Sequence, residues 1–300
     1  MNKKATVKST LVSLLYLAPA IIFIGIFTIY PIFKSIDMSF YTDFNIFSGE
    51  INARGMDNYQ ELLTDPEFFK ALKNTAIYVI GVVPASITIS LFVAVLLNSI
   101  PKFQGFFRSV YFLPFVTSTV AISVVWSWLY HSRYGLINYI LGLFGVDAIN
   151  WLGDPDNAMI AVIIMAIWKG LGFNILLLLV GLNNISDNYY RAAKVDGAGV
   201  WARFTNITIP LLRPTLFLLS VVGTINSFKV FDEVFALFNG RPGPAGSATT
   251  VVYYLFRKFY EQFDYGVAAA SGIVLFLIVL VITIIQYLGN RYFEKRGGQA

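Results

Sequence analysis

Four ionisable side chains lie inside stretches of sequence that are otherwise apolar: Lys169, Lys229, Asp232 and Glu233. An ionisable group at the centre of a bilayer costs at least ~2.5 kcal/mol even on lenient scales, and such residues usually face a cavity or a partner. Lys229 and Asp232 are three residues apart, so on one helix they could form an ion pair, whereas Glu233 points elsewhere. The chemistry open to these groups is a structural ion pair, contact with a substrate such as a carboxylate, or a proton relay.

The sequence lacks the residue sets that most other chemistry requires. It has no cysteine and one histidine, His131, which excludes a cysteine nucleophile and any multi-histidine metal site. It has neither a Gly-x-Ser-x-Gly elbow nor a His-Glu-x-x-His motif, so nothing supports an intramembrane enzyme. A Gly-x-x-x-x-Gly-Lys-Ser/Thr phosphate loop is also missing. We therefore expect no catalytic residue, no metal and no cofactor in this chain.

The composition is typical of a membrane protein. Hydrophobic residues make up 57% and charged residues 13%, with a mean hydropathy of +0.67, whereas a soluble domain is nearer half apolar and a quarter charged. The net charge of +5 does not indicate a nucleic-acid partner, because the basic residues form no run or patch.

Six stretches are long enough to cross a bilayer as helices, which takes roughly 20 apolar residues. We expect an all-α membrane protein with one transmembrane domain over 11–288, containing spans at about 11–33, 75–98, 109–130, 158–182, 215–238 and 267–288. Pro19, Pro84 and Pro114 lie in the first three spans and predict kinks, which can serve helix packing or a transport pathway.

The distribution of basic residues predicts the orientation. With the N-terminus inside, the cytoplasmic pieces are 1–10, 99–108, 183–213 and 289–300. They hold twelve basic and three acidic residues, against eight and twelve in the outer pieces. The excess of Lys and Arg on one side follows the positive-inside rule, so we expect both termini in the cytoplasm.

The outer segments carry their own helix signals. Asp65-Pro66-Glu67 is typical of a helix start, and we expect that helix to continue into the second span. The turn-rich residues 240–244 predict a break after the fifth span, followed by a short helix over 249–262.

The inner segment 183–213 is longer than a simple connection needs. Ser186 can cap a helix that begins near Asp187, and Gly197 can end it because glycine accepts a positive φ. A second amphipathic helix is predicted over 200–207, and Pro210 and Pro214 are expected to close the loop before the fifth span. Two short helices at the membrane surface can dock into a cytosolic partner or rest on lipid headgroups, and the physics alone leaves both possibilities open.

This segment resembles the EAA loop of binding-protein-dependent ABC importer permeases. The similarity lies in Arg191-Ala-Ala-Lys-Val-Asp-Gly-Ala198 followed by Ile207-Thr-Ile-Pro210. Arg191 stands where the family has Glu, which reverses a charge, and Ile209 stands where it has Leu. The resemblance implies that the loop docks on the ATP-binding subunit through residues that include Arg191, Ala192, Ala193, Asp196, Gly197, Ala198, Phe204 and Pro210.

Further motifs resemble the maltose-type and glycerol-3-phosphate-type sugar permeases, carbohydrate uptake family 1. They are 55–59, 65–68, 74–75, 168–173, 227–232, 239–242 and 265–270. The resemblance implies the type I ABC importer architecture, with this chain as the first of two permease subunits. The partners it implies are a second homologous permease, two copies of a cytosolic ATP-binding subunit that carries ATP and Mg, and an extracytoplasmic sugar-binding protein. The implied location is the bacterial plasma membrane, and the implied cargo is a sugar, with an oligosaccharide favoured.

Sugar sites combine aromatic faces with amide and hydroxyl groups. In the resembling permeases, the spans that flank the loop line the pathway. On this basis we predict that the pathway is lined by Gly170, Phe173, Asn174, Asn226, Ser227, Lys229 and Asp232. The alternative for the small residues is helix packing.

An ion-coupled secondary transporter is the second hypothesis, since the four intramembrane charges could form a proton relay. The docking loop on one side only and the lack of an inverted repeat speak against it.

Overall fold

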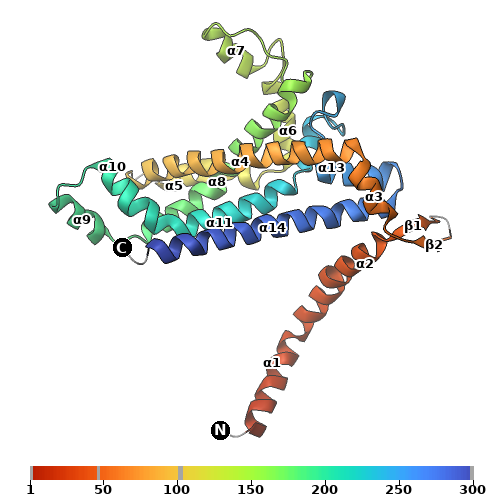
Figure 1. The fold of residues 1–300 in the computed structure, drawn as a ribbon. Helices are drawn as coiled ribbons and strands as arrows, with labels where there is room; N and C mark the ends of the chain where they lie inside the picture. Colours follow the sequence, from red (N-terminus) through yellow and green to blue (C-terminus); the bar gives the residue numbers. More distant parts are fainter. Residues whose placement is uncertain (1–2, 46–47, 101–103, 298–300) are drawn as a thin grey trace. The chain divides into compact units, whose positions relative to one another are not determined.

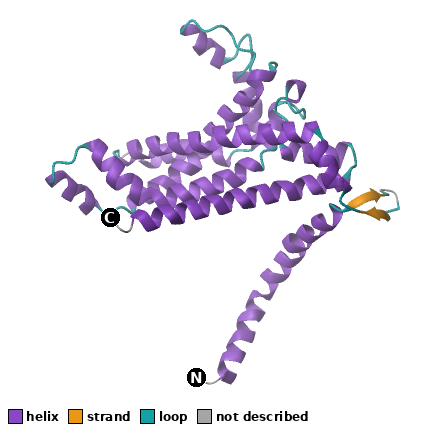
Figure 2. Ribbon diagram, viewed as in Figure 1, coloured by secondary structure: helices purple, strands orange, loops and turns teal. Residues whose placement is uncertain are grey.

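The computed structural model of the chain describes residues 3–45, 48–100 and 104–297. Most of them are helical (Figures 1 and 2). The chain forms two compact units, one of residues 1–65 with 255–274 and one of residues 66–254 with 275–300. Within the described residues, five helices are long and apolar enough to cross a membrane, or six if a bent pair counts as one span, as the sequence predicts.

The first unit combines a long N-terminal helix with a small hairpin. Helix α1 (Lys3–Ile24) continues through a π-helical turn, η1 (Gly25–Ile29), into α2 (Tyr30–Met38). Strands β1 (Tyr41–Phe44) and β2 (Ile51–Arg54) pair antiparallel, followed by α3 (Asp57–Thr64). The side-chain amide of Asn58 donates to the carbonyls of Ser39 and Tyr41, both at 2.9 Å, and so ties α3 to the hairpin. The sequence analysis did not foresee this hairpin.

The second unit is a helical bundle. Its helices are α4 (Pro66–Asn98), α5 (Gln104–Val116), α6 (Thr119–Leu129), α7 (Leu136–Leu143), α8 (Pro155–Asn183), α9 (Asp187–Val195), α10 (Val200–Arg203), α11 (Ile209–Phe228) and α12 (Asp232–Leu237). After a 3₁₀ turn, η4 (Pro244–Gly246), come α13 (Val251–Phe256), a π-helical turn η5 (Arg257–Glu261) and α14 (Tyr265–Gly297). Of this last stretch, residues 255–274 belong to the first unit. Helix α8 packs along α4 and α5, and α11 packs on both α4 and α8.

Several local expectations are confirmed. Helix α4 begins at Pro66 and runs without interruption past Pro84 to Asn98. Residues 240–246 form turns, and the predicted short helix is α13 with η5. The third span is bent by 99° between α5 and α6, at a break that follows Pro114.

The expected end of the inner segment is wrong. The helix that starts at Val200 does not stop at Ile207 but runs through α10, a π-helical turn η3 (Phe204–Thr208) and α11 to Phe228. Proline at position 210 cannot donate a backbone hydrogen bond. The preceding turn is widened, with the amide of Ile209 donating to the carbonyl of Phe204, and this wider turn lets the helix continue.

The expected end of the fifth span is also wrong. Helix α11 ends at Phe228, ten residues before the predicted boundary, and α12 begins only at Asp232. The carbonyl of Val230, which has left the helix, accepts a hydrogen bond of 2.9 Å from the hydroxyl of Thr250. A side chain thus replaces the lost backbone donor at the break.

The close packing of α5 on α8 can be tested by substituting Gly172. A Cβ at this position would lie 2.0 Å from the carbonyl oxygen of Tyr111, whereas a Cβ at Gly170 would meet nothing within 4 Å. We expect Gly172→Ala to destabilise the protein by about 1–3 kcal/mol, because the helices must move apart. Gly170→Ala, on the same helix, is the control. The midpoint of thermal unfolding in detergent measures both, and equal midpoints would contradict the packing described.

Candidate functional site

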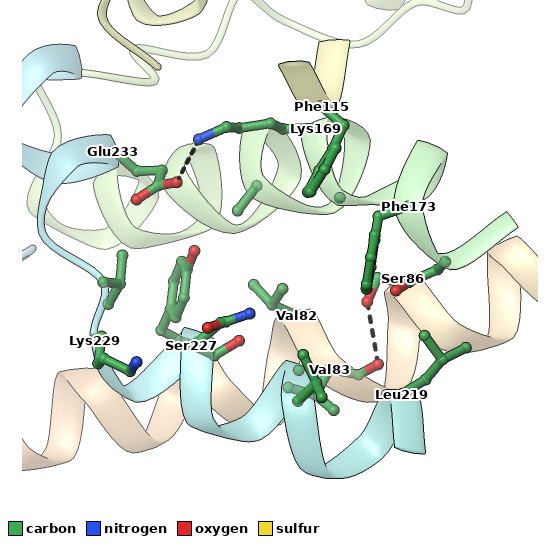
Figure 3. A pocket seen from close by; sticks show the side chains of 18 of the residues that line it. Val82, Val83, Ser86, Phe115, Lys169, Phe173, Leu219, Ser227, Lys229 and Glu233 are labelled. Carbon is green, nitrogen blue, oxygen red and sulfur yellow. Dashed lines mark hydrogen bonds and ion pairs between the residues drawn. The ribbon is translucent and has the colours of Figure 1, made fainter. Parts of the chain in front are cut away.

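A cavity of about 260 Å³ lies between the helices of the second unit (Figure 3). Its walls come from α4, α5, α8, α11, the break after α11 and the start of α12. The lining residues are Tyr78, Val82, Val83, Ser86, Phe115, Ala166, Lys169, Gly170, Phe173, Asn174, Leu219, Val222, Gly223, Asn226, Ser227, Lys229, Val230, Phe231, Asp232 and Glu233.

The structure brings together all seven residues that the sequence analysis placed on a pathway. Gly170, Phe173 and Asn174 come from α8, Asn226 and Ser227 come from α11, and the others from the break and α12. Their role in transport stays a prediction, but they share one cavity. The cavity wall on α4 was missed, although Tyr78, Val82 and Ser86 recur at the spacing of one helical face.

An aromatic pair forms part of the wall. The rings of Phe115 and Phe173 are stacked, with centroids 5.1 Å apart and an interplanar angle of 22°. Phe115 belongs to α5, so this contact also joins α5 to α8. Flat aromatic surface of this kind can pack against the apolar face of a ligand ring.

The lysine of α8 forms an ion pair that the sequence did not predict, and its partner is Glu233. The ammonium of Lys169 lies 3.0 Å from the carboxylate of Glu233 and also donates to the hydroxyl of Thr119. Each of the two charged side chains is only 18% exposed. Sequence spacing could not show this pair, because Lys169 and Glu233 lie on different helices and 64 residues apart.

The predicted ion pair of Lys229 with Asp232 is wrong, because it assumed that both residues lie on one helix. Lys229 caps the end of α11 and Asp232 is the first residue of α12, so the two do not share a helix. Both side chains are exposed and line the cavity, and no ion pair joins them within the described part of the chain. Figure 3 shows Lys229 apart from the pair of Lys169 and Glu233.

The predicted coupling loop, residues 183–213, forms a separate region. Helix α9 starts as expected, since the hydroxyl of Ser186 accepts from the amide of Asn188 at 3.3 Å. It ends at Val195. Gly197, two residues further on, has a φ of +78°, and the amide of Ala198 donates to the carbonyl of Ala193 at 2.8 Å. This is the geometry of a helix end closed by a left-handed glycine.

The eight predicted coupling residues lie in three places. Arg191, Ala192 and Ala193 are on α9, Asp196, Gly197 and Ala198 follow it, Phe204 begins η3, and Pro210 is in the first turn of α11. None of them lines the cavity. The continuous helix from Val200 to Phe228 connects this region to the cavity wall.

A metal ion needs a set of ligand side chains that lie close together. Among residues 3–45, 48–100 and 104–297, no group of three or more His, Asp or Glu side chains is placed to hold a metal ion.

Comparison with known proteins identifies the class. Residues 76–297 match the family described as "Binding-protein-dependent transport system inner membrane component". The chain belongs to this family, and it is therefore a multi-pass membrane component of a transport system rather than a catalytic enzyme.

Individual relatives are similar over nearly their whole length. The lactose transport system permease protein LacF of Rhizobium radiobacter is 37% identical over 92% of this chain and 93% of its own. The trehalose/maltose transport system permease protein MalF of Thermococcus litoralis is 32% identical over 97% of this chain and 98% of its own. A bacterial ABC transporter that imports the acidic polysaccharide alginate has the same fold, with a TM-score of 0.83 at 24% identity, covering 96% of this chain and 98% of that one.

The ion pair of the cavity can be tested by breaking it. We expect Glu233→Gln to destabilise the protein by about 1–3 kcal/mol, because Lys169 is left largely buried without its counter-charge. Asp232→Asn, the neighbouring exposed carboxylate, is the control and should change stability by less than about 0.5 kcal/mol.

Thermal unfolding of the purified variants measures both effects. The double variant Lys169→Met/Glu233→Gln should recover part of the loss, since no unpaired charge remains. If Glu233→Gln lowers the stability equally in the presence of Lys169 and of Met at position 169, the two side chains are not coupled.

Proposed function

We propose that this chain is a transmembrane permease subunit of an ATP-driven, binding-protein-dependent importer, and that it forms half of the pathway for a sugar. The main support is one observation: a single helical run from Val200 to Phe228 carries the coupling loop at one end and cavity-lining residues at the other. A rigid element of this kind can convert movement of the loop into movement of the cavity wall.

The proposed assembly contains four further subunits. A second homologous permease completes the pathway, and two copies of a cytosolic subunit bind ATP and Mg and dock on the coupling loops. An extracytoplasmic protein delivers the sugar. The family description names a binding-protein-dependent system, and the alginate transporter has been solved with a periplasmic protein bound to an alginate pentasaccharide. The location that follows is a bacterial plasma membrane, with both termini in the cytoplasm.

The proposed mechanism is alternating access. ATP binding closes the two ATPase subunits, the coupling loops move with them, and α11 turns the cavity toward the outside. The binding protein then releases its sugar into the cavity, and ATP hydrolysis returns the cavity to the inside. Opening the cavity to one side and then to the other requires its wall to change conformation. The break between α11 and α12 is a site where a helix can pivot.

The cavity offers the contacts that a sugar requires. Phe173 supplies a ring face, and Asn174, Asn226 and Ser227 supply amide and hydroxyl groups. Lys229 can donate to a sugar oxygen and Asp232 can accept from a hydroxyl, while Gly170 leaves the wall open. Relatives named for lactose and for trehalose/maltose make an oligosaccharide the favoured cargo.

The energy source is tested with the complete transporter in proteoliposomes. We expect sugar uptake to require ATP inside and to stop when the ATPase partner carries a substitution that prevents hydrolysis. A protonophore should leave uptake unchanged. Uptake that survives loss of hydrolysis but stops with the protonophore would support an ion-coupled transporter instead.

The coupling loop is tested at its glycines. Gly197 has a φ of +78° and Gly199 a φ of −67°, and a Cβ at either would meet nothing within 4 Å. Gly197→Val forces a β-branched residue into the left-handed region, so we expect uptake to fall about tenfold while ATP hydrolysis persists.

Gly199→Val is the matched control, because it adds the same side chain without the strain. Uptake and ATP hydrolysis are measured in the same vesicles. Equal uptake by the two variants would show that the shape of this loop does not matter for coupling.

A further inference from the structure

A second cavity, of about 180 Å³, lies beside the coupling loop. Its walls come from the ends of α4 and α8, from α9, and from the helical run that begins at Val200. One part of the wall is apolar, with Val95, Leu182 and Phe204. The other part is polar and includes Asn98 and Arg203.

Arg203 has no counter-charge among the described residues. Its side chain is partly buried, and its Nε atom is fully buried without a hydrogen-bond partner. No carboxylate lines the cavity, and no ion pair involves Arg203 within the part of the chain that the structure describes. A guanidinium is always charged, and partial burial without an anion is unfavourable. The carbonyls at the ends of α4 and α8 offer only partial negative charge.

The remaining polar groups are suited to an anion with several oxygens. The hydroxyl of Tyr190 lies 3.0 Å from that of Thr208, and both residues line the cavity together with Asn98. Hydroxyls, an amide and a guanidinium are the usual donors to phosphate oxygens.

The position of the cavity indicates where such an anion comes from. The apolar helices α4 and α8 end at Asn98 and Asn183, so the cavity lies at the level where the hydrocarbon core gives way to headgroups. Basic pockets between membrane helices at this level bind lipid headgroups. The apolar part of the wall suits the glycerol and upper acyl region of a lipid.

We propose that this cavity binds a phosphate group, the chemistry that the headgroup of an anionic phospholipid shares with free phosphate, and that Arg203 is its main ligand. A group bound there contacts the end of α4 and the coupling loop at once. It would therefore steady the loop against the bundle, and its loss would loosen the loop.

The full-length chain, purified in detergent with the subunits that accompany it, is the material for the test. Its thermal unfolding is followed while phosphatidylglycerol, phosphatidylcholine or inorganic phosphate is added. We expect phosphatidylglycerol to raise the midpoint by about 2–4 °C, and Arg203→Gln to require about tenfold more lipid for the same rise.

Two variants serve as controls. Arg213 is an exposed arginine on the same helical run and does not line the cavity, so Arg213→Gln should respond like the unaltered protein. Arg203→Lys keeps the charge and should keep much of the response. If Arg203→Gln does not assemble, Asn98→Leu alters the same cavity and should weaken the response.

The outcomes separate the sources of phosphate. A response to phosphatidylglycerol alone assigns the cavity to a lipid headgroup, and an equal response to inorganic phosphate assigns it to the free anion. The proposal is overturned if neither ligand acts on the unaltered protein, if phosphatidylcholine acts as strongly, or if Arg203→Gln or Asn98→Leu responds unchanged. Sugar uptake need not change in any of these measurements, so failure here leaves the proposed transport function standing.

Discussion

The requirement that every backbone polar group find a partner inside the bilayer determines how this protein can form a cavity. A helix that stops within the apolar region exposes carbonyls that neither water nor lipid can satisfy there. In this chain α11 stops at Phe228, and the carbonyl of Val230 receives its hydrogen bond from Thr250. The break is stable because a side chain from a distant part of the same unit closes it. The bond stabilises the break, and residues 229–233 at this break form part of the cavity wall.

The same requirement explains why α11 extends so far in the other direction. Pro210 removes a backbone donor, which in many helices would produce an end. Here the π-helical turn η3 reorganises the bonding, and the helix continues back to Val200. The result is one long helical run that contains the widened turn η3 near its start and ends at the break after Phe228. Such an element is suited to carry movement from the loop to the cavity, since its middle is packed against α4 and α8.

The sequence predicted the elements well where a local pattern determines them. Ser186 and Gly197 mark the two ends of α9 because capping and a positive φ are properties of single residues. The five predicted pathway residues on α8 and α11 line one cavity because helical spacing places them on facing sides of these helices, whereas Lys229 and Asp232 reach it from the break and from α12. The errors concern contacts between distant residues. Thr250 donates to the carbonyl at the break from 20 residues away, and Lys169 pairs with Glu233 on another helix. Neither interaction leaves a local signal in the sequence.

Charge compensation differs between the two cavities, and this difference follows from their positions. Along the larger cavity, Lys169 and Glu233 neutralise each other, and Lys229 and Asp232 add one charge of each sign. A wall without net charge suits a cargo that must leave again, because a strongly held ion would be trapped. Beside the coupling loop, Arg203 is left without an anion in the described part of the chain. An uncompensated charge at the membrane surface suits a ligand that stays bound. The favourable free energy of pairing Arg203 with an anion is realised only while that anion is bound.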